Sequence, residues 1–240
     1  MTEQLSVTEP STDAQWSETL GVFDLETTGI DVETSRIVSA NVSVIGPDGV
    51  SLERQDWLAD PGIEIPPQAS AVHGITTERA RADGRPALEV IAEILAALRS
   101  IFDRGLALTV YNAPYDLTLL NREAVRYGLA PLLDPAPVID PLVIDKAVDR
   151  YRKGKRTLEA AAIVYGVELT DAHDAGADAI AAGRVAQAMA ARHPVELGIG
   201  ALELHRRQVG WSAEQSANFA AYMRRTHNPD FRENAGWPQR

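Results

Sequence analysis

Two acidic side chains near the end of an apolar segment are the first candidates for chemistry in this sequence. Asp24 and Glu26 lie within and directly after the apolar run 20–25. In a strand, residues two apart point to the same face. Two carboxylates about 4 Å apart repel by about 4 kcal/mol at an effective dielectric near 20, and a cation between them reverses that sign. The pair therefore indicates either a metal site or two solvated acids at a frayed strand end.

Further acids lie near predicted helix starts. Asp116 comes shortly after the apolar run 106–111, and His173 opens an Ala-rich segment that also contains Asp178. The helix dipole favours a carboxylate at a helix N-terminus, so each of these acids taken alone has a structural explanation. If the strands end on the same side of one sheet, Asp116 comes close to Asp24, which is an inference from topology.

Composition limits the metals and partners that fit. The chain has no cysteine, which excludes disulfides and thiolate metal sites and is consistent with a cytoplasmic location. Carboxylate and imidazole ligands suit Mg²⁺ or Mn²⁺. The net charge of -11 disfavours a protein that coats duplex DNA, and leaves an enzyme that grips a strand end locally. We expect no membrane partner, because the sequence contains no run of about 18 apolar residues.

The predicted elements explain how distant acids could meet. Apolar patterning predicts strands over residues 20–25, 37–45, 50–58, 106–111 and 138–140, and helices that start at 86, 114, 157, 174 and 196. The first strands are joined by short hairpins and the later ones alternate with helices, which predicts an α/β class with a mixed sheet flanked by helices. A doubly wound parallel fold is disfavoured, because parallel strands need long crossovers and no Gly-rich phosphate loop follows the first strand.

Four short motifs, taken in order, resemble the DEDDh exonucleases, the DnaQ-like branch of the ribonuclease-H-like superfamily that includes the epsilon proofreading subunit of DNA polymerase III. They are residues 24–29 (DLETTG), 73–76 (HGIT), 112–116 (NAPYD), and His173 with Asp178 five residues later. The resemblance spans about residues 19–192. It implies a ribonuclease-H-like mixed five-stranded sheet in an exonuclease domain over 18–193. Outside that domain, the polar and acidic composition of residues 1–17 predicts a disordered tail, and the pattern of residues 194–240 predicts a helical C-terminal extension.

The same resemblance implies the function and its residues. It implies a 3′–5′ exonuclease that hydrolyses the terminal phosphodiester of DNA in proofreading or repair and releases nucleoside 5′-monophosphates. Two Mg²⁺ or Mn²⁺ ions would be held by Asp24, Glu26, Asp116 and Asp178, and His173 would be the general base. Substrate contacts would come from Thr27, Thr28, Gly29, His73, Ile75 and Asn112. Tyr111 is a departure, because many relatives have His at that position.

Two other functions remain open at this point. One is a 3′–5′ exoribonuclease that trims RNA or short oligoribonucleotides, because discrimination rests on contacts to the 2′-OH that motifs do not reveal. The other is an inactive nucleic-acid-binding scaffold, which the complete acidic set disfavours. The expected partner is a nucleic-acid 3′ end, in single-stranded DNA. A DNA polymerase or a sliding clamp is a further candidate; residues 4–7 (QLSV) resemble a clamp-binding peptide only faintly, and we favour chance similarity.

Three remaining features each have two interpretations. Asp140 is either a supporting acid or a turn residue, and we favour the turn. The aromatic-containing segment 196–240 either packs on the domain or presents an interface, and packing is the default. A basic stretch either contacts backbone phosphates or is a solvated loop; it comprises Arg150, Arg152, Lys153, Lys155 and Arg156.

Overall fold

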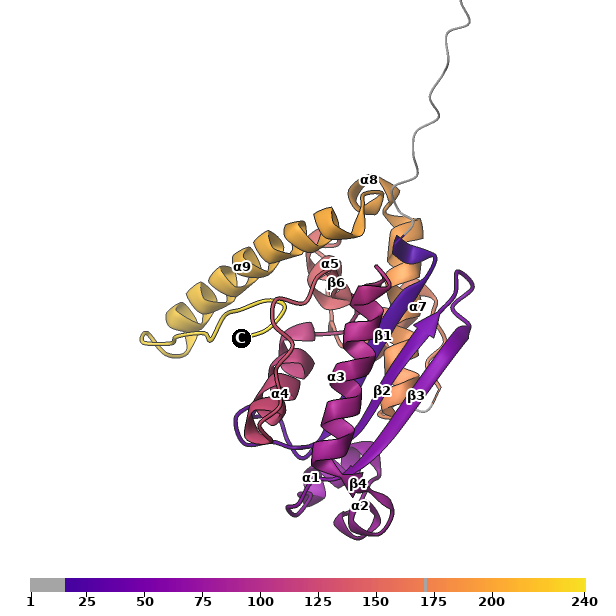
Figure 1. The fold of residues 1–240 in the computed structure, drawn as a ribbon. Helices are drawn as coiled ribbons and strands as arrows, with labels where there is room; N and C mark the ends of the chain where they lie inside the picture. Colours follow the sequence, from indigo (N-terminus) through magenta and orange to yellow (C-terminus); the bar gives the residue numbers. More distant parts are fainter. Residues whose placement is uncertain (1–15, 171) are drawn as a thin grey trace, which may run out of the picture.

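The chain folds around a mixed sheet with helices on both faces. The computed structural model describes residues 16–170 and 172–240 (Figure 1). The strand order is β4-β3-β2-β1-β5-β6. The strands are β1 (Leu20–Thr27), β2 (Ile37–Ile45), β3 (Ser51–Asp60), β4 (Arg85–Pro86), β5 (Ala107–Thr109) and β6 (Val138–Ile139). The predicted α/β class is confirmed. The sheet has six strands where five were predicted, because the two-residue β4 is too short for an alternating pattern.

Strand direction decides where the functional residues gather. β1, β2 and β3 pair antiparallel, whereas β5 runs parallel to β1 and β6 runs parallel to β5. The carboxyl ends of β1, β5 and β6 therefore lie at the same edge of the sheet. Glu26 is the last residue but one of β1 at that edge, Asn112 follows β5, and Asp140 follows β6 directly.

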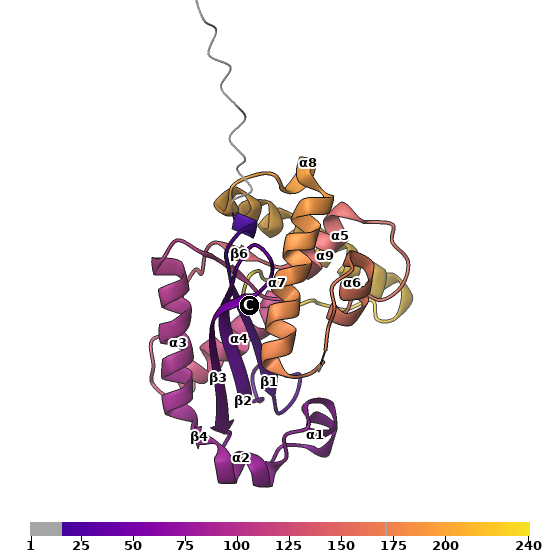
Figure 2. The same ribbon diagram turned by 90° about the vertical axis from the view of Figure 1, so that its right-hand side faces the viewer.

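The helices form a layer on each face and an arm beyond the sheet. They are α1 (Pro67–His73), α2 (Thr77–Asp83), α3 (Ala87–Asp103), α4 (Ala113–Arg126), α5 (Pro141–Val148), α6 (Leu158–Tyr165), α7 (Ala175–Arg192), α8 (Pro194–Leu197) and α9 (Ala201–Thr226). Figure 2 shows α3 and α7 on opposite faces of the sheet. In Figure 1, α9 leads away from the sheet and the last residues return towards α4. The prediction missed four short helices, α1, α2, α5 and α8; α1, for example, has no buried residue and hence no amphipathic pattern.

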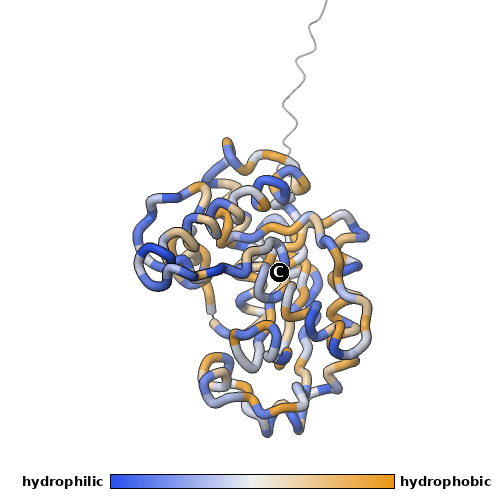
Figure 3. The backbone as a smooth tube through the Cα atoms, turned by 90° about the vertical axis from the view of Figure 1, so that its left-hand side faces the viewer, coloured by the Kyte–Doolittle hydropathy of each residue, from blue (hydrophilic) through white to orange (hydrophobic). Residues whose placement is uncertain are grey.

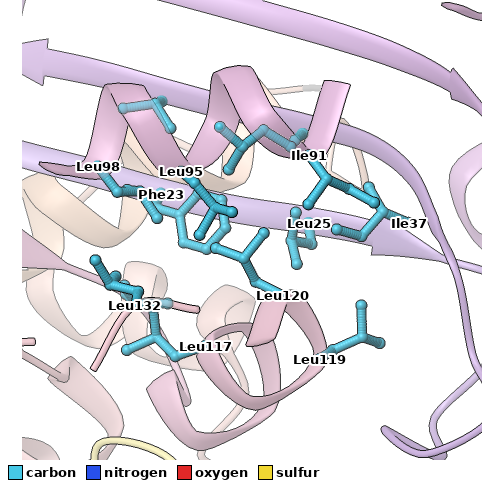
Figure 4. Packing of buried hydrophobic residues seen from close by; sticks show 14 of the residues in the cluster. Phe23, Leu25, Ile37, Ile91, Leu95, Leu98, Leu117, Leu119, Leu120 and Leu132 are labelled. Carbon is cyan, nitrogen blue, oxygen red and sulfur yellow. The ribbon is translucent and has the colours of Figure 1, made fainter. Parts of the chain in front are cut away.

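Alternation along β1 separates two cores. Phe23 and Leu25 pack into the core beneath α3 and α4, whereas Leu20 and Val22 pack into the core beneath α7. Figure 4 shows Phe23 and Leu25 among the leucines of α3 and α4, and Figure 3 shows hydrophobic stretches inside with hydrophilic ones on outer loops. Since side chains two apart share a face, Asp24 and Glu26 lie on the α7 side of the sheet.

Small residues let α7 approach the sheet closely. A Cβ on Gly183 would lie 2.5 Å from Cδ1 of Ile45 and 2.6 Å from Cγ1 of Val22. Ala179, Ala182 and Ala186 of the same helix are almost completely buried. This close approach holds the first turn of α7, which carries Asp178, against β1.

Two predictions concern the N-terminal residues of the chain, and a third concerns the membrane. Trp16, within the predicted tail 1–17, is buried, and its Nε1 donates a hydrogen bond to the carbonyl oxygen of Leu197 at 3.3 Å. The clamp-like peptide over residues 4–7 lies outside the described residues. Within the part of the chain that the structure describes, no helix has the length and apolarity needed to cross a bilayer.

The packing of α7 gives a stability prediction. We expect Gly183→Ala to lower the free energy of unfolding by about 1–3 kcal/mol, because the added methyl overlaps Val22 and Ile45. Gly210→Ala in α9 is the matched control: nothing lies within 4 Å of its Cβ position. The control should gain about 0.5–1 kcal/mol from the lower chain entropy of Ala. Urea denaturation measures both, and equal stabilisation by the two substitutions would contradict the packing of α7.

Candidate active site

Two of the predicted acids and the predicted base lie within reach of one another. Glu26 projects from β1 towards the first turn of α7, where Asp178 lies, and His173 directly precedes that helix. One ligand atom from each of Glu26, His173 and Asp178 lies within 4.8 Å of the other two. Glu26 and His173, which are 147 positions apart in the chain, therefore lie next to each other.

Asp116 comes close to the same acids from α4, on the opposite face of the sheet. It lies in the first turn of α4, is 3% exposed, and accepts a hydrogen bond from the backbone N–H of Leu25 at 3.2 Å. Asp24 and Asp116 together line a cavity of about 370 Å³ that extends to Glu159 of α6. The fold thus brings all four predicted acids around the end of β1.

Burial and mutual repulsion raise the pKa values of the acids. Burial raises the pKa of Asp24, and the neighbouring Asp116, Asp178 and Glu26 raise it further. Burial, followed by the charges of Asp178 and Asp174, raises the pKa of Glu26 from its ordinary value of 4.5 to about 8. Without a cation, the site holds protons near neutral pH that exposed carboxylates would have lost.

The donor set fits a hard divalent cation. Asp178 uses one carboxylate oxygen, Oδ2, to accept a hydrogen bond from the backbone N–H of His173 at 3.1 Å. Its other oxygen, Oδ1, is buried and has no hydrogen-bond partner among the described residues. A buried acceptor without a partner is costly. Such an oxygen, surrounded by carboxylates and one imidazole, is what Mg²⁺ or Mn²⁺ would satisfy.

His173 lies on an exposed, strained turn. Its φ is 71°, in the left-handed region that few residues other than Gly adopt. Its Nε2 lies 3.9 Å from Oε1 of Glu159, and both side chains are about half exposed. Glu159 was not predicted, because two residues after the helix cap Thr157 an acid looks like an ordinary dipole partner.

The threonines after β1 build the turn beside the acids. Thr27 Oγ1 donates to the carbonyl oxygen of Gly29 at 2.8 Å and shares a 2.6 Å hydrogen bond with the hydroxyl of Tyr115. Thr28 Oγ1 accepts from the backbone N–H of Arg36 at 2.9 Å. Both threonines are buried, whereas Ile30 after them is 94% exposed. The hydroxyls therefore stabilise the turn, and Ile30 is the side chain that it presents to solvent.

The remaining predicted substrate residues differ from one another. His73 ends α1, and burial lowers its pKa; the backbone of Thr27 raises it and His173 lowers it, so the ring lies beside the site. Ile75 is 7% exposed and packs with a small core cluster, which leaves its side chain little surface for a nucleotide. Asn112 lines the cavity next to Asp116 with a φ of 64°.

Asp140 supports this turn, and the interpretation as a plain turn residue was wrong. It is completely buried, and its carboxylate accepts hydrogen bonds from the backbone N–H groups of Asn112, Ala113 and Leu142, each at 3.0 Å. Asp140 thereby holds the left-handed Asn112 and the start of α4, the helix that carries Asp116. Nothing local in the sequence indicates contacts 28 residues away.

The C-terminal extension holds Asp140 in turn, so packing on the domain is its structural role. Gln208 of α9 is completely buried; its Oε1 accepts from the N–H of Asp140 at 2.7 Å, and its Nε2 donates to the carbonyl oxygen of Val138 at 3.0 Å. Trp237 Nε1 donates to Asp140 Oδ2 at 3.2 Å. Side chains of the extension therefore form hydrogen bonds with backbone N–H and C=O groups at the free edge of β6, as a neighbouring strand would.

Two arginines of the basic stretch are structural. Arg152 and Arg156 both bind the carboxylate of the completely buried Asp145, the latter at 2.7 Å. Tyr111, the one departure from the motifs noted in the sequence, donates its hydroxyl to the carbonyl oxygen of Arg156 at 2.8 Å. A buried carboxylate needs such partners. Phosphate contact thus stays a prediction for Arg150, Lys153 and Lys155 only.

Comparison with known proteins identifies the family. Residues 22–186 match the model of the RNase_T family, which is described as an exonuclease. The chain belongs to this exonuclease family. The predicted resemblance is confirmed, and membership makes the protein a nuclease, a hydrolase of phosphodiester bonds. The matched region contains the four acids and His173, and it ends before the extension that holds Asp140.

Individual relatives of this exonuclease differ in length. A DNA polymerase III subunit epsilon-like protein of Rhodobacter capsulatus is 33% identical over 167 residues, 68% of this chain but 22% of that protein. The DNA polymerase III subunit epsilon of Treponema pallidum is 28% identical, over 73% of this chain and 78% of its own. A structure of exonuclease I superposes with a TM-score of 0.64 at 22% identity, over 75% of this chain and 42% of that one. That likeness shows the fold.

The raised pKa of Glu26 predicts how stability depends on pH. Without metal, the unfolded chain ionises Glu26 above 4.5, whereas the folded chain keeps its proton up to about 8. The folded state binds more protons in this window, so its stability falls as pH rises. We expect Tm in EDTA to fall less in Glu26→Gln than in the parent, and Mg²⁺ to raise the parent's Tm most at the alkaline end. Identical pH profiles of parent and variant would contradict the burial of this carboxyl.

The hydrogen bond from Trp237 gives a second prediction for this site. We expect Trp237→Phe to reduce nuclease activity by up to about ten-fold and to raise the Mg²⁺ concentration needed, since supporting groups tune metal affinity. Trp57→Phe is the control, because it removes an indole N–H bound to Glu93 Oε2 at 2.8 Å, and its side chain packs in the core beneath α3, on the face of the sheet opposite Asp24 and Glu26. Activity is measured for both variants as a function of Mg²⁺ concentration. Equal effects of the two substitutions would contradict a supporting role of Asp140 in the site.

Proposed function

We propose that this exonuclease is a 3′–5′ enzyme that removes nucleoside 5′-monophosphates from single-stranded DNA ends with two divalent cations, Mg²⁺ or Mn²⁺. The observation that carries the proposal is the convergence of Asp24, Glu26, Asp116 and Asp178 from three elements, with His173 beside them. Structures of E. coli exonuclease I hold dT13 and dA16 oligonucleotides, which supports single-stranded DNA as the substrate class.

Each residue then has a chemical task. The four carboxylates hold the cations, which when bound stabilise negative charge on the attacking and leaving oxygens. His173 takes the proton of the attacking water, a task that imidazole performs well near neutral pH. Glu159, whose Oε1 lies 3.9 Å from Nε2 of His173, faces the ring and helps to orient it. The exposed turn of His173 allows the imidazole to adjust when substrate binds.

The substrate end fits between the turn after β1 and the start of α4. Ile30 offers exposed apolar surface for the terminal nucleobase, and the Thr28–Gly29 backbone lies beside it. Asn112 and His73 border the same site. The epsilon-subunit names of the relatives suggest a DNA polymerase as partner.

Digestion of labelled strands tests the proposal. Single-stranded DNA, a mispaired duplex and RNA of the same sequence are incubated with Mg²⁺, Mn²⁺ or EDTA. We expect mononucleotides released first from the 3′ end of single-stranded DNA, and no release in EDTA. Faster turnover of RNA than of DNA would show that RNA is the preferred substrate. Release from the 5′ end would contradict the proposed 3′–5′ direction.

Substitution of Asp116 tests the acidic cluster itself. Asp116→Asn keeps an oxygen for the N–H of Leu25 but removes the charge, so we expect the fold to persist and activity to fall by more than about 100-fold, beyond the loss typical of supporting residues. Asp103→Asn, an exposed acid at the end of α3, is the control and should retain full activity. His173→Ala should lower kcat more than it raises KM. Full activity of Asp116→Asn at saturating Mg²⁺ would exclude the cluster as the catalytic centre.

A further inference from the structure

A second hollow adjoins the candidate active site. It has a volume of about 610 Å³ and lies between α5, α9 and the last residues of the chain. Asn112 and Leu142 line both this hollow and the cavity of Asp24 and Asp116, so the two share a wall. We call it the α5–α9 groove. Most of it is built by the C-terminal extension, outside the residues 22–186 that match the exonuclease family.

The groove offers polar atoms without partners. Lys146 of α5 lines it with an exposed side chain, which makes no hydrogen bond or ion pair with the described residues. Glu233 Oε2 is buried without a hydrogen-bond partner there as well. Unmet donors and acceptors inside a hollow favour a ligand that carries both an anionic group and N–H donors.

Aromatic surface and a displaceable ion pair complete the groove. Trp211 and Phe219 of α9 line it, and Phe219 is 48% exposed. At its rim Arg150 pairs with Glu214 at 3.6 Å, with both side chains more than 60% exposed. Such exposed pairs are weak, so a phosphate can compete for the arginine. The lining thus combines stacking surface with cations, as single-strand binding sites do.

We propose that the α5–α9 groove binds the nucleotides that precede the scissile residue in a single strand. A nucleobase stacks on Trp211 or Phe219 and donates an amino N–H to Glu233, while its phosphate contacts Lys146 and Arg150. The inference rests on the proposed function, because it places the 3′ end of the strand in the adjacent catalytic cavity.

The charge of the groove decides what kind of binding to expect. Its cations Lys146, Arg150 and Arg240 are balanced by Glu214, Glu233 and the buried Asp140. The groove is thus neutral in a chain of net charge -11. It neither attracts a nucleic-acid strand over a long range nor repels it as the acidic remainder of the surface does. Binding then depends on contact, and a stacked base is worth roughly five-fold in affinity or more.

Two substrates separate the groove from the catalytic cavity. The p-nitrophenyl ester of thymidine 5′-monophosphate is small enough to occupy the catalytic cavity alone, whereas a DNA decanucleotide also reaches the groove. We expect Lys146→Gln/Phe219→Leu to raise KM for the decanucleotide by about ten-fold, from one lost phosphate contact and one lost stack. Its kcat and KM for the ester should stay within about two-fold of the parent, because that substrate carries no preceding nucleotide.

A matched double variant controls for charge and aromatic loss. Arg206→Gln/Tyr222→Leu removes one exposed cation and one aromatic ring from α9; Tyr222 is 47% exposed, as Phe219 is, and neither residue lines the groove. It should match the parent on both substrates. Thermal melting of each variant confirms the fold.

The outcomes distinguish two failures. If the parent hydrolyses neither substrate, the proposed function is wrong. If the parent hydrolyses both and Lys146→Gln/Phe219→Leu keeps the parent's KM for the decanucleotide, the nuclease assignment stands and the groove does not bind the strand. An equal rise of KM in both double variants would likewise overturn the inference, because the effect would then come from the loss of a cation and an aromatic ring in general.

Discussion

Repulsion among buried carboxylates is the constraint on which this structure depends. Burial and neighbouring charge raise the pKa of Asp24, Glu26 and Asp116 together, so none of them is stable as an isolated anion there. The acids remain close because each is carried by an element anchored elsewhere. β1 is held between two cores, α4 packs on one face, and the close contact of Gly183 fixes α7 on the other. Folding energy from hydrophobic burial thereby supports a site that only bound cations make favourable.

The C-terminal extension completes this arrangement from outside the family match. Gln208 and Trp237 bind Asp140, Asp140 binds the turn of Asn112, and that turn starts the helix of Asp116. Each link is a buried or partly buried hydrogen bond. Such links transmit position because an unsatisfied partner is costly. The extension therefore bears on the active site without contributing a carboxylate to it.

Local charge, more than total charge, explains how an acidic protein can act on a nucleic-acid strand. The acids of the site call for cations, and Arg152 and Arg156 are occupied by the buried Asp145. What remains for a strand is Lys153 and Lys155 of the basic stretch, and a neutral groove with aromatic surface beside the site. Contact with a single strand over a short length fits this distribution better than the coating of a duplex.

The sequence by itself determined the local elements and the motif set. The alternation of β1 placed Asp24 and Glu26 on one face, and the cap Thr157 with Gly166 bounded α6. These signals lie within a few residues, where periodicity and capping operate. Only the tertiary structure decided that Asp140 is a buried anchor, that Glu159 faces His173, and that Gln208 completes the β6 edge. Those partners are 14 to 70 residues apart, and a side chain's partner at such distance depends on how the elements pack.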